Sequence, residues 1–150
     1  MSLAASFPED FVKQHFNEID LGSAVLVEIS DFNISHKKFA IYFANDVKNE
    51  GCCGLIIINS EINENVNRNA FLKSQHILID VKRHKFLDYD SFVDCTQIHN
   101  HKLQDIIDCI VKNPKRLLGN IQPDILEKIY IKILHSKLIS KKDKEKYSII

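Results

Sequence analysis

A compact basic run, Lys82-Arg83-His84-Lys85, is the strongest candidate for binding phosphate groups in this sequence. Cationic side chains neutralise phosphate charge, and the nearby rings of Phe86 and Tyr89 could stack on unpaired bases. Charge runs of this length also occur in loops that only keep a protein soluble. The run therefore predicts a contact with single-stranded nucleic acid, and a solvated hairpin loop is the alternative.

His36 is a candidate proton shuttle because it directly precedes Lys37 and Lys38. An imidazole titrates near pH about 6.5, which suits general acid–base chemistry in neutral solution. The two lysines beside it add positive charge, so the segment could act on an anionic substrate. A solvated loop is again the alternative.

The histidines and cysteines do not predict a metal centre. His99 and His101 lie on one side of an extended segment, but no carboxylate or third histidine follows at a useful spacing. The four cysteines lack both the Cys-x-x-Cys pattern and a zinc-finger spacing. We therefore expect packed, reduced thiols, a surface loop around His99, no metal and no cofactor.

Composition limits the class of protein. The chain has 150 residues, of which 45% are hydrophobic and 27% charged, so one folded domain over residues 1–150 is expected. The net charge is zero, so any nucleic-acid site must be a local patch. No apolar run approaches the about 20 residues needed to span a bilayer, and the N-terminus lacks the pattern of a secretory signal. These features favour a cytoplasmic protein that does not associate with membranes.

Alternating and β-branched apolar runs predict five strands, which must position these side chains. An N-terminal helix is expected before them, within residues 1–21, because Ser6 and Glu9 form a capping-box pattern ahead of apolar residues at helical spacing. An Asn-rich polar loop is expected over residues 61–69. The strands are predicted at Ala24–Ile29, Lys38–Ala44, Cys52–Ser60, His76–Val81 and Ser91–Thr96, with the third one apolar enough to be central.

Two amphipathic helices follow the strands. The first has an apolar stripe beginning at Leu103 and ends at Asn113-Pro114, and the second begins at Pro123 and carries its stripe as far as Leu138. The lysine-rich tail over residues 140–150 is predicted to be flexible and solvated. We therefore expect a mainly β protein with helices, in the α+β class.

The order of these segments resembles the MazF/PemK family of toxin endoribonucleases between about residues 22 and 139. The matching stretches are 38–46, Ile57-Ile58-Asn59-Ser60, Leu87-x-x-Asp90-Ser91-x-Val93 followed by Gln97-Ile98, and Gly119-Asn120-Ile121 before the last helix. Lys38 stands where the family has its catalytic arginine, Phe39 replaces the following proline, and Phe86 replaces a glycine. The N-terminal helix and a long connection from His99 to Leu118 are additions to the family pattern.

The resemblance implies an SH3-like small β-barrel of five to seven strands with a C-terminal amphipathic helix. It also implies metal-independent cleavage of single-stranded RNA, in which the ribose 2′-hydroxyl attacks the adjacent phosphate. Lys38 and Ser60 are then the catalytic pair, because a cation beside a hydroxyl can stabilise charge on phosphoryl oxygens. Lys38 and Ser60 should lie at the ends of neighbouring strands, in one open concavity bordered by residues 82–85.

The expected partners follow from the same resemblance. They are single-stranded RNA, an antitoxin protein and a second copy of the chain, since the stripes beginning at Leu103 and Ile125 exceed what one small barrel needs to cover itself. A catalytically inactive barrel that binds nucleic acid or protein remains the alternative, because Lys38 lacks the bidentate fork of an arginine.

Overall fold

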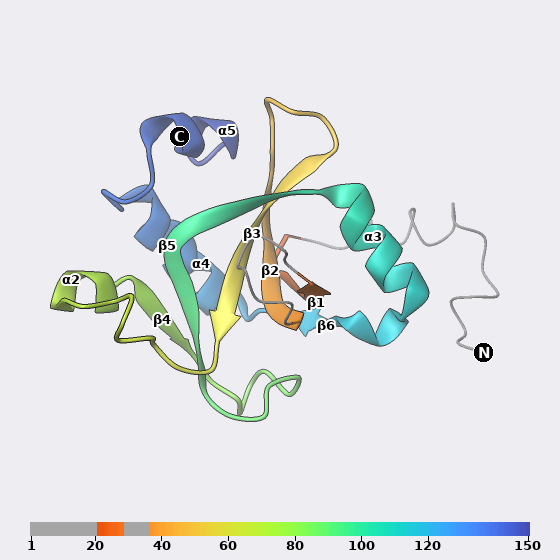
Figure 1. The fold of residues 1–150 in the computed structure, drawn as a ribbon, viewed down its shortest axis with the longest axis horizontal. Helices are drawn as coiled ribbons and strands as arrows, with labels where there is room; N and C mark the ends of the chain where they lie inside the picture. The colour runs from red at the N-terminus through yellow and green to blue at the C-terminus, as the bar shows by residue number, and fades with distance from the viewer. Residues whose placement is uncertain (1–20, 29–36) are drawn as a thin grey trace.

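The computed structural model describes residues 21–28 and 37–150, which form a six-stranded antiparallel sheet with helices on both faces (Figure 1). The predicted N-terminal helix and His36 lie outside the described residues. The sheet order is β4-β5-β3-β2-β1-β6, so β3 is central, as its apolar sequence predicted. The strands are β1 (Ser23–Glu28), β2 (Lys37–Asn45), β3 (Cys52–Asn59), β4 (His76–Ile79), β5 (Ser91–Lys102) and β6 (Leu117–Asn120).

The sheet curls into a half-barrel (Figure 1). The long strand β5 crosses β3 with a register irregularity: Leu55 lies opposite His99, but Ile57 lies opposite Asp94. Extra residues on one strand bend a sheet and increase its twist. Among the described strands, β4 and β6 form the two edges and do not pair with each other, so the predicted closed SH3-like barrel is not confirmed.

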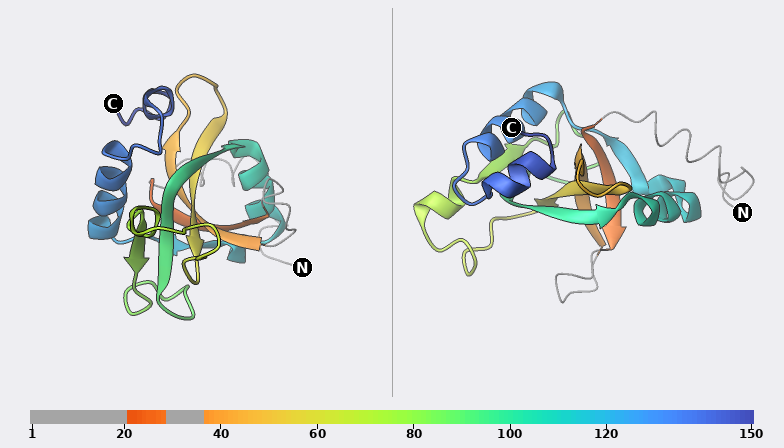
Figure 2. Two further views of the ribbon diagram at one scale, coloured as in Figure 1. Left: turned by 60° about the vertical axis from the view of Figure 1, so that its left-hand side comes forward. Right: turned by 90° about the horizontal axis from the view of Figure 1, so that it is seen from above.

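Both faces of the sheet are covered, which explains the continuous apolar runs in β2 and β3. Alternate residues of β3 belong to different cores: Ile56 and Ile58 pack on one side, and Leu55 and Ile57 on the other. The helix α3 (Leu103–Lys112) covers the second side, whereas α4 (Pro123–Leu134) and α5 (Lys141–Lys146) cover the first (Figure 2). The half-barrel is therefore the middle layer of the molecule.

The two predicted helical stripes are buried inside the same chain. Ile106, Ile107 and Ile110 of α3 pack in the second core, and α4 contributes three isoleucines to the first core. The helix α3 ends at Asn113-Pro114 as predicted, and α4 begins at Pro123 as predicted but ends at Leu134, before Leu138. Because both stripes are used internally, they give no support to the expected dimer.

The C-terminal tail is ordered, and the prediction of a flexible tail over residues 140–150 is wrong. The Ser140 side chain accepts a hydrogen bond from the Asp143 N–H and caps α5. Tyr147 and Ile149 then enter the first core, where each is 5% exposed. A Cβ on Gly54 would come within 2.9 Å of the Tyr147 ring, so this glycine makes room for the tail.

A buried carboxylate, Asp46, ties the tail to the turn between β2 and β3. It accepts hydrogen bonds from the Asn49 side chain, from the Lys48 and Asn49 backbone and from the Asn100 side chain, and Lys146 lies 3.6 Å away. Burial raises the pKa of Asp46, but these donors outweigh it and lower that pKa to about 2. Asp46 is therefore a structural anion.

Three short features were not predicted from the pattern. The helix α2 (Ala70–Lys73) follows the polar loop at 61–69, the 3₁₀ turn η3 (Pro114–Arg116) follows α3, and the edge strand β6 pairs with β1. The segment at His99 and His101 is part of β5, not a surface loop. Within the described part of the chain, no helix has the length and apolar character needed to cross a bilayer.

Candidate active site

The antiparallel pairing of β2 with β3 brings Lys38 and Ser60 together. Phe39 lies opposite Ile58, so Lys38 lies opposite Asn59, and Ser60 is the next residue along the chain. Both line a pocket of about 230 Å³, which we call the strand-end pocket. Its lining residues come from β2, from the end of β3 and from the segment before β5: Lys37, Lys38, Phe39, Ile58, Asn59, Ser60, Leu87, Asp88, Tyr89 and Ser91.

Lys38 is half-buried and has an amide as its partner. Its Nζ donates a hydrogen bond of 3.3 Å to Asn59 Oδ1. Among the described residues, no carboxylate forms an ion pair with Lys38, and Ser60 is exposed. A cation held by a neutral acceptor can still bind an anion, because its charge is not neutralised. Lys37, one residue earlier, is exposed at the same pocket.

Arg83 contacts two carboxylates of its own chain. Its guanidinium lies 2.9 Å from Asp80 Oδ1 and 2.9 Å from Asp124 Oδ1, at the start of α4. The Arg83 side chain lowers the pKa of Asp80 to about 2 and also lowers the pKa of Asp124, and the two carboxylates raise the pKa of Arg83. Arg83 therefore joins the loop before β5 to α4.

His84 is buried, with 1% of its surface exposed. The Gln122 N–H donates to Nε2 at 3.0 Å, so Nδ1 carries the proton and donates to the Asp80 carbonyl at 2.8 Å. With both ring nitrogens used and only 1% of its surface exposed, His84 is not placed to contact RNA, contrary to its inclusion in the RNA-binding set. Its role is to fix the loop at residues 80–90, which we call the pocket loop.

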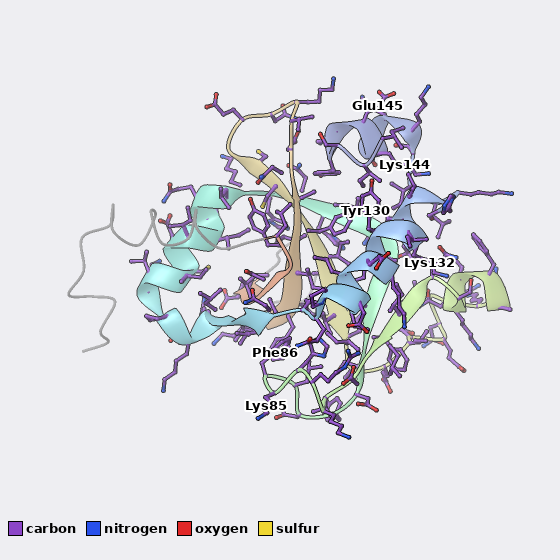
Figure 3. The ribbon with its side chains drawn as sticks, turned by 180° about the vertical axis from the view of Figure 1, so that it is seen from behind. Lys85, Phe86, Tyr130, Lys132, Lys144 and Glu145 are labelled. Carbon is purple, nitrogen blue, oxygen red and sulfur yellow. The ribbon has the colours of Figure 1, made fainter. Side chains whose placement is uncertain are left out.

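Lys82 and Lys85 are exposed, as Arg83 is, but unlike Arg83 they form no ion pair with a described residue. Lys85 lies at the outside of the pocket loop, next to Phe86 (Figure 3). The Phe86 ring packs edge-on against Phe39, with centroids 6.1 Å apart, so it supports the fold and does not offer a free stacking face. Neither lysine lines the strand-end pocket, to which their loop contributes Leu87, Asp88 and Tyr89, so their expected place at its border stays a prediction.

Asp88 and Tyr89 line the strand-end pocket; the sequence suggested Tyr89 as a stacking face, whereas Asp88 was missing from the predicted site. Tyr89 is 57% exposed, and Asp88 is exposed without a hydrogen bond or ion pair to any described residue. Asp90, two residues on, differs because it accepts a hydrogen bond from the Val81 N–H at 2.9 Å. The sequence signal for this pair was only the presence of polar residues between an apolar Leu87 and the predicted strand that begins at Ser91.

Among the described residues, the other histidines and the cysteines do not line this pocket. His99 and His101 are opposite Leu55 and Cys53, toward the other end of β3. All four cysteines are free thiols, and burial raises the pKa of Cys53 and of Cys95 to about 12. Thiols in this state are not nucleophiles at neutral pH. Within the described part of the chain, no three His, Cys, Asp or Glu side chains group around a possible metal position.

A larger cavity of about 590 Å³ lies between β4, α2 and α4. Its wall includes Phe71, Ile131 and Lys132, and Figure 3 shows Lys132 on the side of α4 that faces α2. Its wall also carries lysines and the hydroxyl of Ser136, but Ser136 is only 5% exposed and its Oγ accepts a hydrogen bond from the Leu138 N–H. We favour the strand-end pocket because the hydroxyl that meets a cation there, Ser60, is exposed.

No protein-family model matches the chain, and no curated protein matches it. The resemblance to the MazF/PemK family therefore stays a prediction, and the geometry of the pocket must support any function.

Proposed function

We propose that this chain is a metal-independent endoribonuclease that cleaves single-stranded RNA, as toxins of the MazF/PemK family do. The observation that supports it is the shared position of Lys38 and Ser60, which are 22 residues apart in sequence and line one open pocket. The Lys38 charge is not neutralised by a carboxylate among the described residues.

In the proposed reaction, the scissile phosphate binds between Lys38 Nζ and Ser60 Oγ. The ribose 2′-oxygen attacks phosphorus and loses its proton, and the bond to the 5′-oxygen of the next nucleotide breaks. The products are a 2′,3′-cyclic phosphate and a 5′-hydroxyl. Lys38 stabilises the charge that develops on the phosphoryl oxygens, and Ser60 donates a hydrogen bond to one of them. The sequence offers His36 or Lys38 for the proton transfers.

Lys37, Lys82 and Lys85 are the proposed contacts with flanking phosphates, since each is exposed. Tyr89 offers a face on which a base can stack. Arg83 and His84 contribute indirectly, because they hold the loop that carries Tyr89.

The alternative is a binding module without catalysis, and one observation favours it. Lys38 presents a point charge where the family has an arginine, and its amine already donates to Asn59. Lys38→Arg separates the two functions. A weakened catalytic site should gain cleavage rate with the arginine, whereas a site used only for binding should gain affinity and no cleavage.

The finer features of the family are part of the same proposal. We propose that the half-barrel corresponds to the family's SH3-like barrel, that the protein acts in the cytoplasm, and that an antitoxin protein holds it inactive. The homodimer remains a prediction. Its support is now limited to exposed apolar side chains such as Tyr130 and Ile131, which are 41% and 48% exposed. Light scattering showing a single 17 kDa species at tens of micromolar would contradict it.

The direct test is incubation of the purified chain with a mixed-sequence single-stranded RNA, once with EDTA and once with magnesium. We expect cleavage at the same positions in both samples. Intact RNA in both would favour the binding module. Lys141→Ala is the matched control for Lys38 variants, because it removes an exposed lysine at α5, on an element that does not line the pocket.

A further inference from the structure

The pocket loop presents two side chains that phosphoryl transfer does not use, Asp88 and Tyr89. Both line the strand-end pocket beside the proposed catalytic pair. The Asp88 carboxylate has no partner among the described residues, and more than half of Tyr89 is exposed. Free acceptor oxygens next to an exposed aromatic ring are what a protein needs to hold a flat ligand that carries hydrogen-bond donors.

The loop that carries this pair is held in place before any ligand arrives. Arg83 connects it to Asp124 of α4, and His84 connects it to the Gln122 backbone. Leu87, the residue before Asp88, is buried and anchors the loop at that point. A recognition group on a fixed loop loses little conformational entropy on binding, so it can discriminate between similar ligands.

Asp88 is also the one carboxylate among the described residues that line the strand-end pocket. A carboxylate repels a bound phosphate, so Asp88 in the pocket that Lys38 also lines is unfavourable unless another part of the ligand binds it. In RNA, that other part is a base. Sequence-specific recognition of single-stranded RNA depends on stacking and on hydrogen bonds to base edges.

The four bases differ in the donors that they offer to a carboxylate. The Watson–Crick edge of guanine carries two adjacent donors, N1–H and N2–H, which match two carboxylate oxygens. Adenine and cytosine place one amino donor beside a ring nitrogen that accepts, and uracil places one N–H between two carbonyls. Only guanine can therefore make a bidentate contact without setting an acceptor against Asp88.

We propose that Asp88 and Tyr89 form a guanine subsite, in which Asp88 accepts from N1–H and N2–H and Tyr89 stacks on the ring. If the chain cleaves RNA as proposed, the subsite makes cleavage specific for RNA with a guanine beside the scissile phosphate. This part of the inference rests on the proposed endoribonuclease function. Nucleotide binding to the subsite does not require catalysis, so it can be measured separately.

The test is titration of the full chain with each of the four ribonucleoside 3′-monophosphates, followed by calorimetry or by amide chemical shifts. We expect the guanine nucleotide to bind about tenfold or more tightly than the other three, the usual effect of one bidentate base contact. Asp88→Asn keeps the size of the side chain but removes one acceptor, and it should bring the four affinities close together. Tyr89→Ala should weaken all four nucleotides, because stacking does not depend on base identity.

Asp105→Asn is the matched control, because it removes one exposed carboxylate from α3, on an element that does not line the pocket. It should leave the guanine preference intact. Equal affinities in the unmodified chain, binding by none of the four nucleotides, or a preference that survives Asp88→Asn would each overturn the subsite. RNA cleavage without base preference would leave the endoribonuclease standing and remove the subsite. Guanine binding that depends on Asp88, in a chain that cleaves no RNA, would support the subsite and contradict the endoribonuclease.

Discussion

Two basic segments lie near the strand-end pocket, and their side chains have different partners. Lys38, at the start of β2, donates to a neutral amide and is half-buried at the pocket. In the pocket loop, Arg83 pairs with two carboxylates, and His84 is buried with both ring nitrogens bonded. Similar composition therefore serves two purposes: a cation without a counter-charge can bind substrate, whereas a paired cation stabilises structure. The partners of a basic residue, not its neighbours in sequence, indicate its role.

The largest expected effect is on catalysis by Lys38, at the start of β2. Lys38→Ala should lower the rate of RNA cleavage by about 100-fold or more, because one group that stabilises developing phosphoryl charge typically has that effect. Ser60→Ala should also lower the rate, and neither change should alter the urea midpoint of unfolding much, since both side chains are at the pocket surface. A cleavage rate within a few-fold of the Lys141→Ala control would show that Lys38 is not catalytic.

The next effect is on stability at the second segment. His84→Ala leaves the N–H of the half-buried Gln122 without its acceptor and opens a cavity, so we expect the free energy of unfolding to fall by about 2–4 kcal/mol. Urea denaturation measures it. The exposed His135 is the control, and His135→Ala should change stability by less than about 0.5 kcal/mol. Equal effects for the two histidines would contradict the structural role of His84.

Arg83→Ala should destabilise the fold less than His84→Ala, because its ion pairs are exposed, and the loss should depend on pH. The pKa of Asp80 is lowered to about 2 in the folded chain, and that of Asp124 is also lowered. Carboxylates with depressed folded pKa values stabilise the fold above their unfolded pKa of about 4, and this contribution is lost as pH falls toward 2.

The melting temperatures of the unmodified chain and of Arg83→Ala should therefore differ at pH 7 and converge as the pH is lowered from about 5 toward 2. Lys82→Ala, on the same loop, should show no such convergence. A difference between the unmodified chain and Arg83→Ala that stays constant over this range would exclude the ion pairs as its cause.

The smallest effect is expected at Lys85, an exposed lysine of the pocket loop. Lys85→Ala should weaken binding of a single-stranded RNA only a few-fold, and it should make the salt dependence of log K shallower by about 0.7, the contribution of one phosphate contact. Fluorescence anisotropy at several salt concentrations gives both quantities. An unchanged slope would show that Lys85 serves solubility alone.

Local pattern predicted most of the fold. Strands β1 to β5 and the starts of α3 and α4 follow from alternation, apolar stripes and the position of Pro123. The strand β6 has only four residues, and its pairing of Leu117 with Val25 spans most of the chain, so no local signal specifies it. The lysines of α5 predicted a solvated tail, so the core positions of Tyr147 and Ile149 were missed. The space at Gly54 that receives Tyr147 exists only in the assembled sheet.

Part of the candidate site could also be predicted from the sequence, and part of it could not. The meeting of Lys38 and Ser60 could be predicted, because consecutive strands joined by a short turn pair in antiparallel register. The exposure of Asp88 and the burial of His84 could not, since the pocket loop is oriented by contacts with Gln122 and Asp124, about 40 residues later in the sequence. The residue types of Arg83 and His84 suggested phosphate binding, but their tertiary contacts give both a structural role.

The measurement that tests the central claim most directly uses a short RNA cleaved by the unmodified chain in EDTA, together with the same RNA carrying a 2′-deoxy nucleotide at the cleaved position. We predict that the unmodified RNA yields a 2′,3′-cyclic phosphate and a 5′-hydroxyl, and that the 2′-deoxy substrate binds but stays intact. Cleavage of the deoxy substrate at the same bond, or loss of all cleavage in EDTA, would contradict 2′-hydroxyl attack at Lys38 and Ser60.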